Sequence, residues 1–89
     1  MSIKDSLFVS LFDSIKDIKQ IYIFKRDGIT EYWFETDEYC EDVEEDIFRR
    51  YSIFKRKSPE PMKIIVFSKD ELYDGVDISC DILLRRKGW

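Results

Sequence analysis

The sequence predicts an α+β domain, with two helices packed on one face of a small, mainly antiparallel four-stranded sheet. Two segments carry apolar residues at helical spacing, and two others are rich in β-branched and aromatic residues. Of two further segments, one is apolar on both sides and one alternates between apolar and mostly polar residues. The connections between them are short, and short connections favour antiparallel neighbours. The expected order is α-β-β-α-β-β. With 89 residues the chain has the length of one compact domain, residues 1–89.

The first helix is expected over residues 3–18. Ser2 is a suitable N-cap, and Asp5, three residues later, completes a rough capping box. Phe8 and Phe12 widen an apolar stripe in which residues recur every three or four positions. The residues of this stripe are Ile3, Leu7, Leu11, Ile15 and Ile18. The stripe predicts that this side of the helix faces the core.

A β-hairpin is expected over residues 20–26 and 29–36. Both segments are rich in β-branched and aromatic residues, which favour strands. Between them lies Asp27-Gly28, a pair typical of the type I′ turn because both central residues of that turn need positive φ.

The second helix is expected over residues 38–57. Thr36 or Asp37 can cap its start, and Pro59 and Pro61 end it. Its predicted buried residues are Cys40, Val43, Ile47, Tyr51 and Phe54.

The last two strands are expected over residues 63–68 and 76–86. In the second, apolar and mostly polar residues alternate, which indicates one buried and one mainly exposed face. The inward residues are Val76, Ile78, Cys80, Ile82 and Leu84. Residues 68–75 are compatible with a strand extension, a turn at Asp74-Gly75 or a short helical turn.

The residue inventory argues against catalysis. The chain has no histidine, so a Ser-His-Asp or Cys-His arrangement cannot be built. Its three glycines form no phosphate-binding loop. A pair of carboxylates could still catalyse, but it would need a cleft that so small a domain rarely encloses. We therefore expect no enzyme activity, no cofactor and no metal site.

The two cysteines, Cys40 and Cys80, lie far apart and form no C-x-x-C motif. We expect free, buried thiols; the alternative, a disulfide, needs an oxidising compartment. Apolar runs such as Ile64–Phe67 are too short to span a bilayer, and the first residues lack the pattern of a signal peptide. These features predict a cytoplasmic protein without a membrane partner.

Residues 35–46 contain eight acidic residues and no basic one, whereas residues 47–63 are mainly basic. One interpretation is structural. Acids at a helix start and bases at its end each interact with the helix dipole by about 0.3–1 kcal/mol. Two further ion pairs are expected one turn apart, Glu45 with Arg49 and Asp46 with Arg50.

The second interpretation is functional, because such a density of acids exceeds what the dipole needs. An exposed ridge of carboxylates can imitate backbone phosphates, which in each strand follow one another about every 3.4 Å along the helix axis. It would fit a basic groove on a protein partner. The candidate partner-binding residues are Glu35, Asp37, Glu38, Glu41, Asp42, Glu45 and Asp46.

Several aromatic residues lie in the hairpin, and two helices can cover only one face of the sheet. The candidates for an aromatic interface are Tyr22, Phe24, Tyr32, Trp33 and Phe34. Three alternatives remain. The rest of the chain covers these rings, they form a homodimer or partner interface, or they stack on bases.

Base stacking would need phosphate contacts from the basic residues of the helix end and the C-terminus. These residues are Arg49, Arg50, Lys55, Arg56, Lys57, Arg85, Arg86 and Lys87. The sequence pI of about 4.8 argues against direct nucleic-acid binding. The order of elements also differs from the β-α-β-β-α-β of an RNA-recognition motif.

In size, acidity and lack of catalytic residues, the chain resembles small phage-encoded inhibitors of the anti-restriction and anti-CRISPR type, and immunity proteins that neutralise toxins. The resemblance implies a non-catalytic inhibitor that masks the basic groove of a nuclease, a toxin or another nucleic-acid-binding enzyme. The alternative function is a small nucleic-acid-binding module that uses the aromatic sheet face and the basic helix end.

Overall fold

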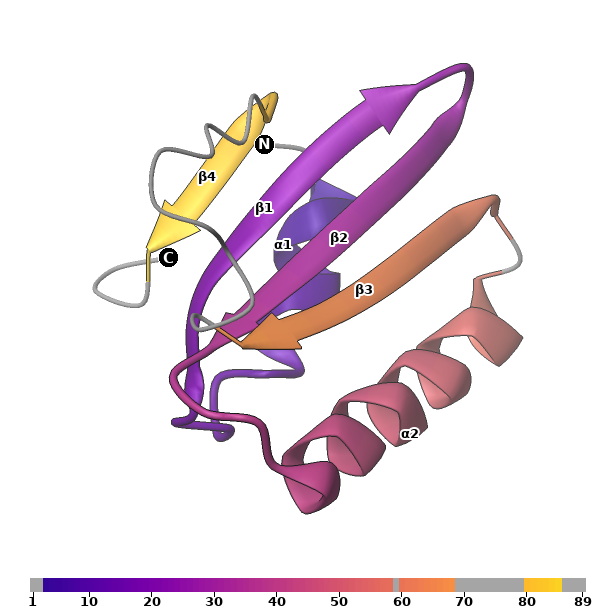
Figure 1. The fold of residues 1–89 in the computed structure, drawn as a ribbon. Coiled ribbons are helices and arrows are strands. Elements are labelled where there is room, and N and C mark those ends of the chain that lie inside the picture. Colours follow the sequence, from indigo (N-terminus) through magenta and orange to yellow (C-terminus); the bar gives the residue numbers. More distant parts are fainter. Residues whose placement is uncertain (1–2, 59, 69–79, 86–89) are drawn as a thin grey trace.

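The computed structural model describes residues 3–58, 60–68 and 80–85. Within these ranges, six elements follow one another (Figure 1). They are α1 (Ile3–Ser10), β1 (Ile18–Arg26), β2 (Ile29–Thr36), α2 (Glu41–Lys57), β3 (Met62–Ser68) and β4 (Ile82–Arg85). The α+β class, with two helices and a four-stranded sheet, is confirmed, and the order of elements agrees roughly with the prediction.

The strands lie in the order β3-β2-β1-β4. β1 pairs antiparallel with both β2 and β4, but β2 pairs parallel with β3. The expectation of antiparallel neighbours is therefore wrong for this pair. The reason is α2, whose 17 residues span about 25 Å and return the chain to the end of the sheet where β2 began.

The predicted hairpin is confirmed. β1 and β2 pair along their length, from Ile18 opposite Thr36 to Arg26 opposite Ile29. The two residues between them, Asp27 and Gly28, have φ values of 50° and 77°. Positive φ at both positions is what a type I′ turn requires, and Asp and Gly tolerate it better than other residues.

Both helices pack on the same face of the sheet, and the main core lies between the two layers. The ring of Phe8 is central to it, with its centroid 4.3 Å from that of Tyr32 and 4.9 Å from that of Phe54. The buried residues of this core are Phe8, Val9, Phe12, Ile15, Ile18, Ile21, Ile23, Tyr32, Phe34 and Ile47.

The first helix is shorter than predicted, because α1 ends at Ser10 and turns carry the chain to β1. The Ser10 hydroxyl donates a hydrogen bond to the carbonyl of Leu7 at 2.7 Å. Beyond it lie Asp13, Ser14 and Asp17, residue types that compete with helical hydrogen bonds and favour turns. Residue spacing could not reveal this end.

The predicted orientation of the first helix is also wrong in part. Ile15 and Ile18 are buried as expected, but Ile3, Leu7 and Leu11 are 82%, 59% and 40% exposed. The buried side of α1 carries Phe8 and Val9 instead, followed by Phe12 in the next turn. Two overlapping apolar stripes existed in the sequence, and the one with the larger aromatic rings faces the core.

Asp5 lies on this buried side and is 2% exposed. Its Oδ1 accepts a hydrogen bond from the Tyr32 hydroxyl at 2.7 Å, and its Oδ2 accepts one from Lys25 Nζ at 2.8 Å. Asp5 therefore ties the first turn of α1 to both central strands, a contact that the predicted capping role did not anticipate.

The second helix begins at Glu41, three residues later than predicted. Cys40 occupies the N-cap position in an extended conformation, without a side-chain capping bond, and the Thr36 hydroxyl bonds the carbonyl of Glu38 instead. The inner side is otherwise as predicted, because Val43, Ile47, Tyr51 and Phe54 pack on the core.

Both cysteines are free, as expected. Cys40 is nevertheless exposed rather than buried, because it precedes α2 instead of lying on its inner stripe. Cys80 is half-buried and packs against the aromatic cluster on the other face of the sheet. Its predicted place on the same face as Ile82 and Leu84 is therefore wrong, because those two residues pack on the main core.

Of the predicted strand 76–86, residues 80–85 are described, and Ile82–Arg85 among them form β4. Ile82 and Leu84 pack on the main core and Leu83 is 40% exposed, so the alternation is confirmed there. The uncertain segment 69–75 lies outside the described residues. Neither α1 nor α2 combines the length and apolar character needed to cross a bilayer.

Candidate protein-binding surface

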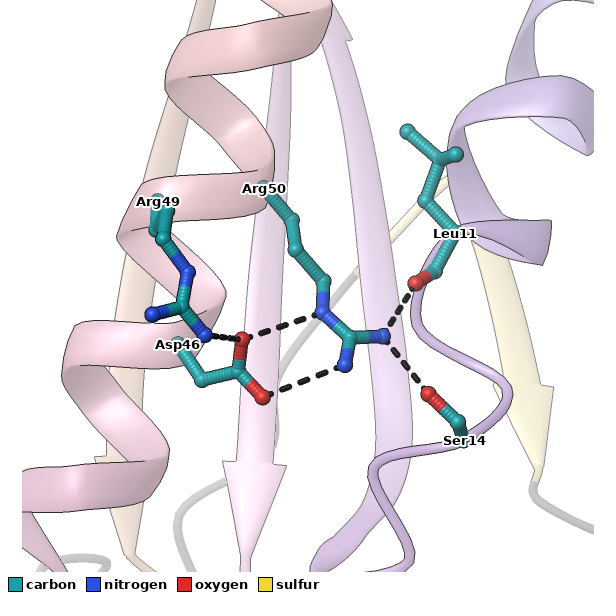
Figure 2. A network of polar contacts seen from close by, with 5 residues as sticks. All are labelled: Leu11, Ser14, Asp46, Arg49 and Arg50. Carbon is teal, nitrogen blue, oxygen red and sulfur yellow. Dashed lines mark hydrogen bonds and ion pairs between the residues drawn. The ribbon is translucent and has the colours of Figure 1, made fainter.

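Arg50 holds α2 against the turn that follows α1 (Figure 2). Its Nη1 donates to the carbonyl of Leu11 at 2.6 Å and to Ser14 Oγ at 2.7 Å. Its Nε and Nη2 donate to the two carboxylate oxygens of Asp46, at 3.1 and 3.2 Å. The guanidinium group thus joins two segments that lie far apart in the sequence, and it fixes the position of α2 on the domain.

Asp46 has a structural role in this network. Arg49 also donates to its Oδ1, at 2.6 Å. Burial works to raise the pKa of Asp46, but the hydrogen bonds and charges of Arg49 and Arg50 outweigh it and lower the pKa below its usual value. The expected Asp46–Arg50 pair is confirmed, whereas Arg49 pairs with Asp46 rather than with Glu45. Asp46 is therefore ionised, and the positive charges of Arg49 and Arg50 balance its negative charge within the chain.

Glu35 does not belong to an exposed ridge. Its position in β2 directs it to the sheet face opposite the helices, where it is 6% exposed. Its Oε1 accepts a hydrogen bond from the Tyr22 hydroxyl at 2.9 Å, and its Oε2 accepts one from Gln20 Nε2 at 2.8 Å. Burial and then the bond to Glu35 raise the pKa of Tyr22 to about 12. The sequence predicts Glu35 to be an exposed partner-binding residue, but it is buried and bonded within the chain, so this part of the prediction is wrong.

Asp37 lies in the loop before α2 and forms an ion pair with Lys19 at 3.3 Å. Both side chains are about half exposed, so this pair contributes little to stability. It does reduce the negative charge that Asp37 presents to a partner.

Four of the predicted carboxylates are exposed: Glu38, Glu41, Asp42 and Glu45. Within residues 3–58, 60–68 and 80–85, no ion pair involves any of these four. They lie around the first turns of α2, on the side away from Ile47.

Two exposed aromatic rings accompany these carboxylates. Tyr39 is 68% exposed and Phe48 is 40% exposed. Both line a shallow groove on α2, together with Glu41, Glu44, Glu45, Arg49 and Ser52. We call the six exposed residues Glu38, Tyr39, Glu41, Asp42, Glu45 and Phe48 the acidic face. Residue spacing places Phe48 beside the buried stripe of α2, but nothing in the pattern identified Tyr39.

The aromatic residues of the hairpin are largely inaccessible. Tyr32 and Phe34 belong to the main core, at 2% and 0% exposed. Tyr22 and Phe24 lie on the other sheet face and are 8% and 5% exposed, packed in a cluster with Phe67. Only Trp33 among the five predicted residues is half-exposed. A large aromatic interface on this hairpin is therefore not present in the structure.

Some of the predicted basic residues are bonded within the chain, and others are exposed. Arg49 and Arg50 are bonded to Asp46, and Lys55 Nζ donates to the carbonyl of Glu60 at 2.8 Å. Arg56 and Lys57 are exposed at the end of α2, and Arg85 is exposed on β4. Arg86 and Lys87 lie outside the described residues.

Across the described ranges, no three Cys, Asp or Glu side chains are arranged to hold a metal ion. No family model matches this chain, and no match was found among curated proteins or among solved structures. Function is therefore inferred from the surface of the molecule alone.

Proposed function

We propose that this protein is a non-catalytic inhibitor that binds a partner protein through its acidic face. The partner would be a nuclease, a toxin or another enzyme with a basic nucleic-acid-binding or catalytic groove, which the acidic face masks. The observation that carries the proposal is the grouping of four exposed carboxylates around the exposed rings of Tyr39 and Phe48.

The chemistry of this surface suits such a groove. Glu41 and Glu45 lie one turn apart, about 6 Å along the helix axis, which is close to two phosphate steps of about 3.4 Å each. Carboxylates at this spacing meet the lysines and arginines that line a nucleic-acid site and steer the approach of the partner. Exposed aromatic rings among them supply the apolar contact area that anchors most interfaces.

The helix dipole accounts for only part of this pattern. It favours acids in the first turn of α2, which includes Glu41 and Asp42. It does not require Glu38 before the helix or Glu45 in the second turn. Nor does it explain why Tyr39 and Phe48 are exposed beside them.

The alternative function, a nucleic-acid-binding module, has less support. Tyr22, Phe24 and Phe67 pack against one another and offer little ring surface to a base. Arg49 and Arg50 are occupied by Asp46, and the formal net charge of the chain is −4. A phosphate backbone would be repelled by the acidic face.

The proposal is tested by immobilising the protein, passing a lysate of its native host over it and identifying the proteins that it retains. We expect the wild-type protein to retain a nucleic-acid-binding protein that a competing oligonucleotide releases. The double variant Glu41→Lys/Glu45→Lys should not retain it. The matched control is Asp17→Lys/Glu60→Lys, which makes the same change in net charge at two exposed positions that are not part of the acidic face. Because Glu60 forms an ion pair with Lys4, thermal denaturation checks that this variant is folded. Equal retention of the same protein by both double variants would refute the proposal.

A further inference from the structure

We propose that the outer edge of β3 binds an extended segment of a partner protein, which joins the sheet as a further strand in a groove between β3 and α2. The segment runs antiparallel to β3 and carries a lysine or arginine that meets Glu44. In this mode of recognition, backbone hydrogen bonds give affinity and alternate side chains give specificity. The proposal does not rest on the inhibitor function, because neither Glu44 nor any residue of β3 belongs to the acidic face.

The pairing of β2 with β3 determines which backbone groups of β3 point outward. Thr30 lies opposite Met62, and its amide donates to the carbonyl of Pro61 at 3.4 Å. In a parallel pair, every second residue of a strand directs both its N–H and its C=O to its neighbour. Counted from Pro61, the residues that face β2 are the odd-numbered ones. The N–H and C=O groups of Ile64 and Val66 therefore point to the outer edge.

A contact from α2 agrees with this direction. The Tyr51 hydroxyl donates to the carbonyl of Met62 at 3.2 Å, so this carbonyl also points away from β2. In the part of the chain that the structure describes, no group bonds the outward N–H or C=O of Ile64 or Val66. An edge strand with unpaired backbone groups is a template for another strand.

α2 forms the other wall of a groove along this edge. Figure 1 shows α2 beside the outer edge of the sheet, next to β3. The groove is lined by Val43 and Glu44 of α2 and by Val66 and Phe67 of β3, among others. A strand added to β3 would lie about 4.8 Å from it and would pack on α2. The same segment would thus gain backbone bonds from β3 and side-chain contacts from α2.

The side chains of the groove favour a basic residue in the segment. Directly opposite residues of an antiparallel pair point to the same face of the sheet. Val66 packs on the main core, so the residue opposite it points towards the helix layer. There a lysine or arginine can lay its aliphatic stem on Val43 and reach the carboxylate of Glu44. Glu44 is half-exposed and forms no ion pair with another described residue, so it is available.

The position opposite Ile64 suits an apolar residue. Ile64 packs on the main core like Val66, and its opposite neighbour would extend this apolar layer. The two selective positions of the segment are therefore two residues apart. Because the segment runs antiparallel, the basic residue comes first.

A second copy of this chain fits the edge less well than a single segment. Antiparallel pairing of two β3 strands needs a two-fold axis perpendicular to the sheet, so both α2 helices would lie on the same face. Each α2 lies beside the edge of its own sheet, and the two helices would compete for the same space (Figure 1). A segment that brings no helix with it avoids this conflict.

The probe for this site is the blocked peptide acetyl-Thr-Lys-Thr-Ile-Thr-amide, titrated into the isotope-labelled protein and followed by NMR. Its lysine and isoleucine are placed to lie opposite Val66 and Ile64. Binding should shift the amide signals of these two residues most strongly, because their N–H groups gain acceptors.

Methylation of the peptide backbone tests the hydrogen bonds without changing the protein. Methyl groups on the lysine and isoleucine nitrogens, which face β3, remove two donors and should weaken binding about tenfold or more. The matched control carries its two methyl groups on the second and third threonine nitrogens, which point away from β3. Its dissociation constant should stay within about threefold of that of the unmethylated peptide.

A matched pair of protein variants tests the charge. Glu44→Lys should weaken peptide binding about tenfold or more, because it sets a like charge against the lysine. Glu45→Lys makes the same change at the next residue, outside this groove, and should have an effect of about threefold or less. Thermal denaturation checks that both variants are folded. Glu41→Lys/Glu45→Lys should still bind the peptide while it loses the partner of the acidic face, so the two proposals can fail separately.

Three results would overturn the proposal. The first is the absence of shifts at Ile64 and Val66 with up to about 1 mM peptide. The second is equal affinity for the two methylated peptides. The third is a shift of the same amide signals with the concentration of the protein alone, which would assign the edge to a second copy.

Discussion

The Tyr32 hydroxyl donates a 2.7 Å hydrogen bond to the carboxylate of Asp5, and both side chains are almost completely buried. Lys25 supplies the opposite charge from the rim, where its side chain is 44% exposed. One carboxylate in the first turn of α1 thereby fixes the helix on β1 and β2. Asp5 lies on the same side of α1 as Phe8 and Val9, so its bonds add to the packing that holds this side against the core.

Loss of this carboxylate should destabilise the domain. In Asp5→Ala the Tyr32 hydroxyl is left buried without its acceptor, which costs about 1–3 kcal/mol of the free energy of unfolding. Chemical denaturation of Asp5→Ala and Tyr32→Phe measures the loss. The two substitutions remove the same hydrogen bond, so we expect Asp5→Ala, which also frees Lys25, to cost more. An unfolding free energy of Asp5→Ala equal to that of the wild type would contradict the role of the network.

The orientation of α1 gives a second prediction. Phe8 is 0% exposed, so Phe8→Ala should cost about 3–5 kcal/mol of the free energy of unfolding. Leu7→Ala should cost no more than about 0.5 kcal/mol, since Leu7 is 59% exposed. Denaturation of the two variants compares neighbouring positions of one helix directly. The reverse order of losses would mean that the predicted apolar stripe, and not the observed one, faces the core.

Removal of the Arg50 clamp should loosen α2. Arg50→Met breaks its hydrogen bonds to Leu11, Ser14 and Asp46 and should cost about 1–3 kcal/mol of the free energy of unfolding. The matched control is Arg49→Met. Its side chain is 71% exposed, so the loss should be about 0.5 kcal/mol or less. Faster amide exchange in residues 11–17 of Arg50→Met alone is the expected signature, and equal exchange in both variants would argue against the clamp.

The raised pKa values of Tyr22 and Tyr32 predict that the domain loses stability at alkaline pH. Burial and the bond to Glu35 raise the pKa of Tyr22 to about 12, and burial and the bond to Asp5 also raise that of Tyr32. Unfolded tyrosines ionise near pH 10. The contribution of Tyr22 is therefore complete below about pH 10 and is lost as the pH rises towards 12.

Absorbance of tyrosinate and thermal denaturation, followed together from pH 9 to 12, check this dependence. In Tyr22→Phe the free energy of unfolding should decrease less steeply with rising pH, because the variant lacks one hydroxyl whose pKa is raised by folding. A stability that is constant across this range in the wild type would show that the two hydroxyls are not held as described.

Local features of the sequence predicted the local structure. Asp27-Gly28 specified the hairpin turn, and the spacing of Val43, Ile47, Tyr51 and Phe54 specified the inner side of α2. These signals act between residues close in the chain, so they do not depend on the rest of the fold.

Features that depend on distant contacts were not predictable in this way. The bond from Tyr32 to Asp5 crosses 27 positions, and the burial of Glu35 depends on Tyr22 from a neighbouring strand. The parallel pairing of β2 with β3 follows from the direction in which α2 packs. For the candidate site, the acids were found by composition, but only the fold separates buried Glu35 and bonded Asp46 from the exposed carboxylates.

The central claim is that the acidic face binds a basic groove, and the dissociation constant of the captured partner tests it most directly. Like charges across an interface cost several kcal/mol, and each 1.4 kcal/mol is a factor of ten. Glu41→Lys/Glu45→Lys should therefore weaken binding by about 100-fold or more, while Asp17→Lys/Glu60→Lys leaves it within about threefold of the wild type. An unchanged dissociation constant in the folded Glu41→Lys/Glu45→Lys variant would contradict the claim.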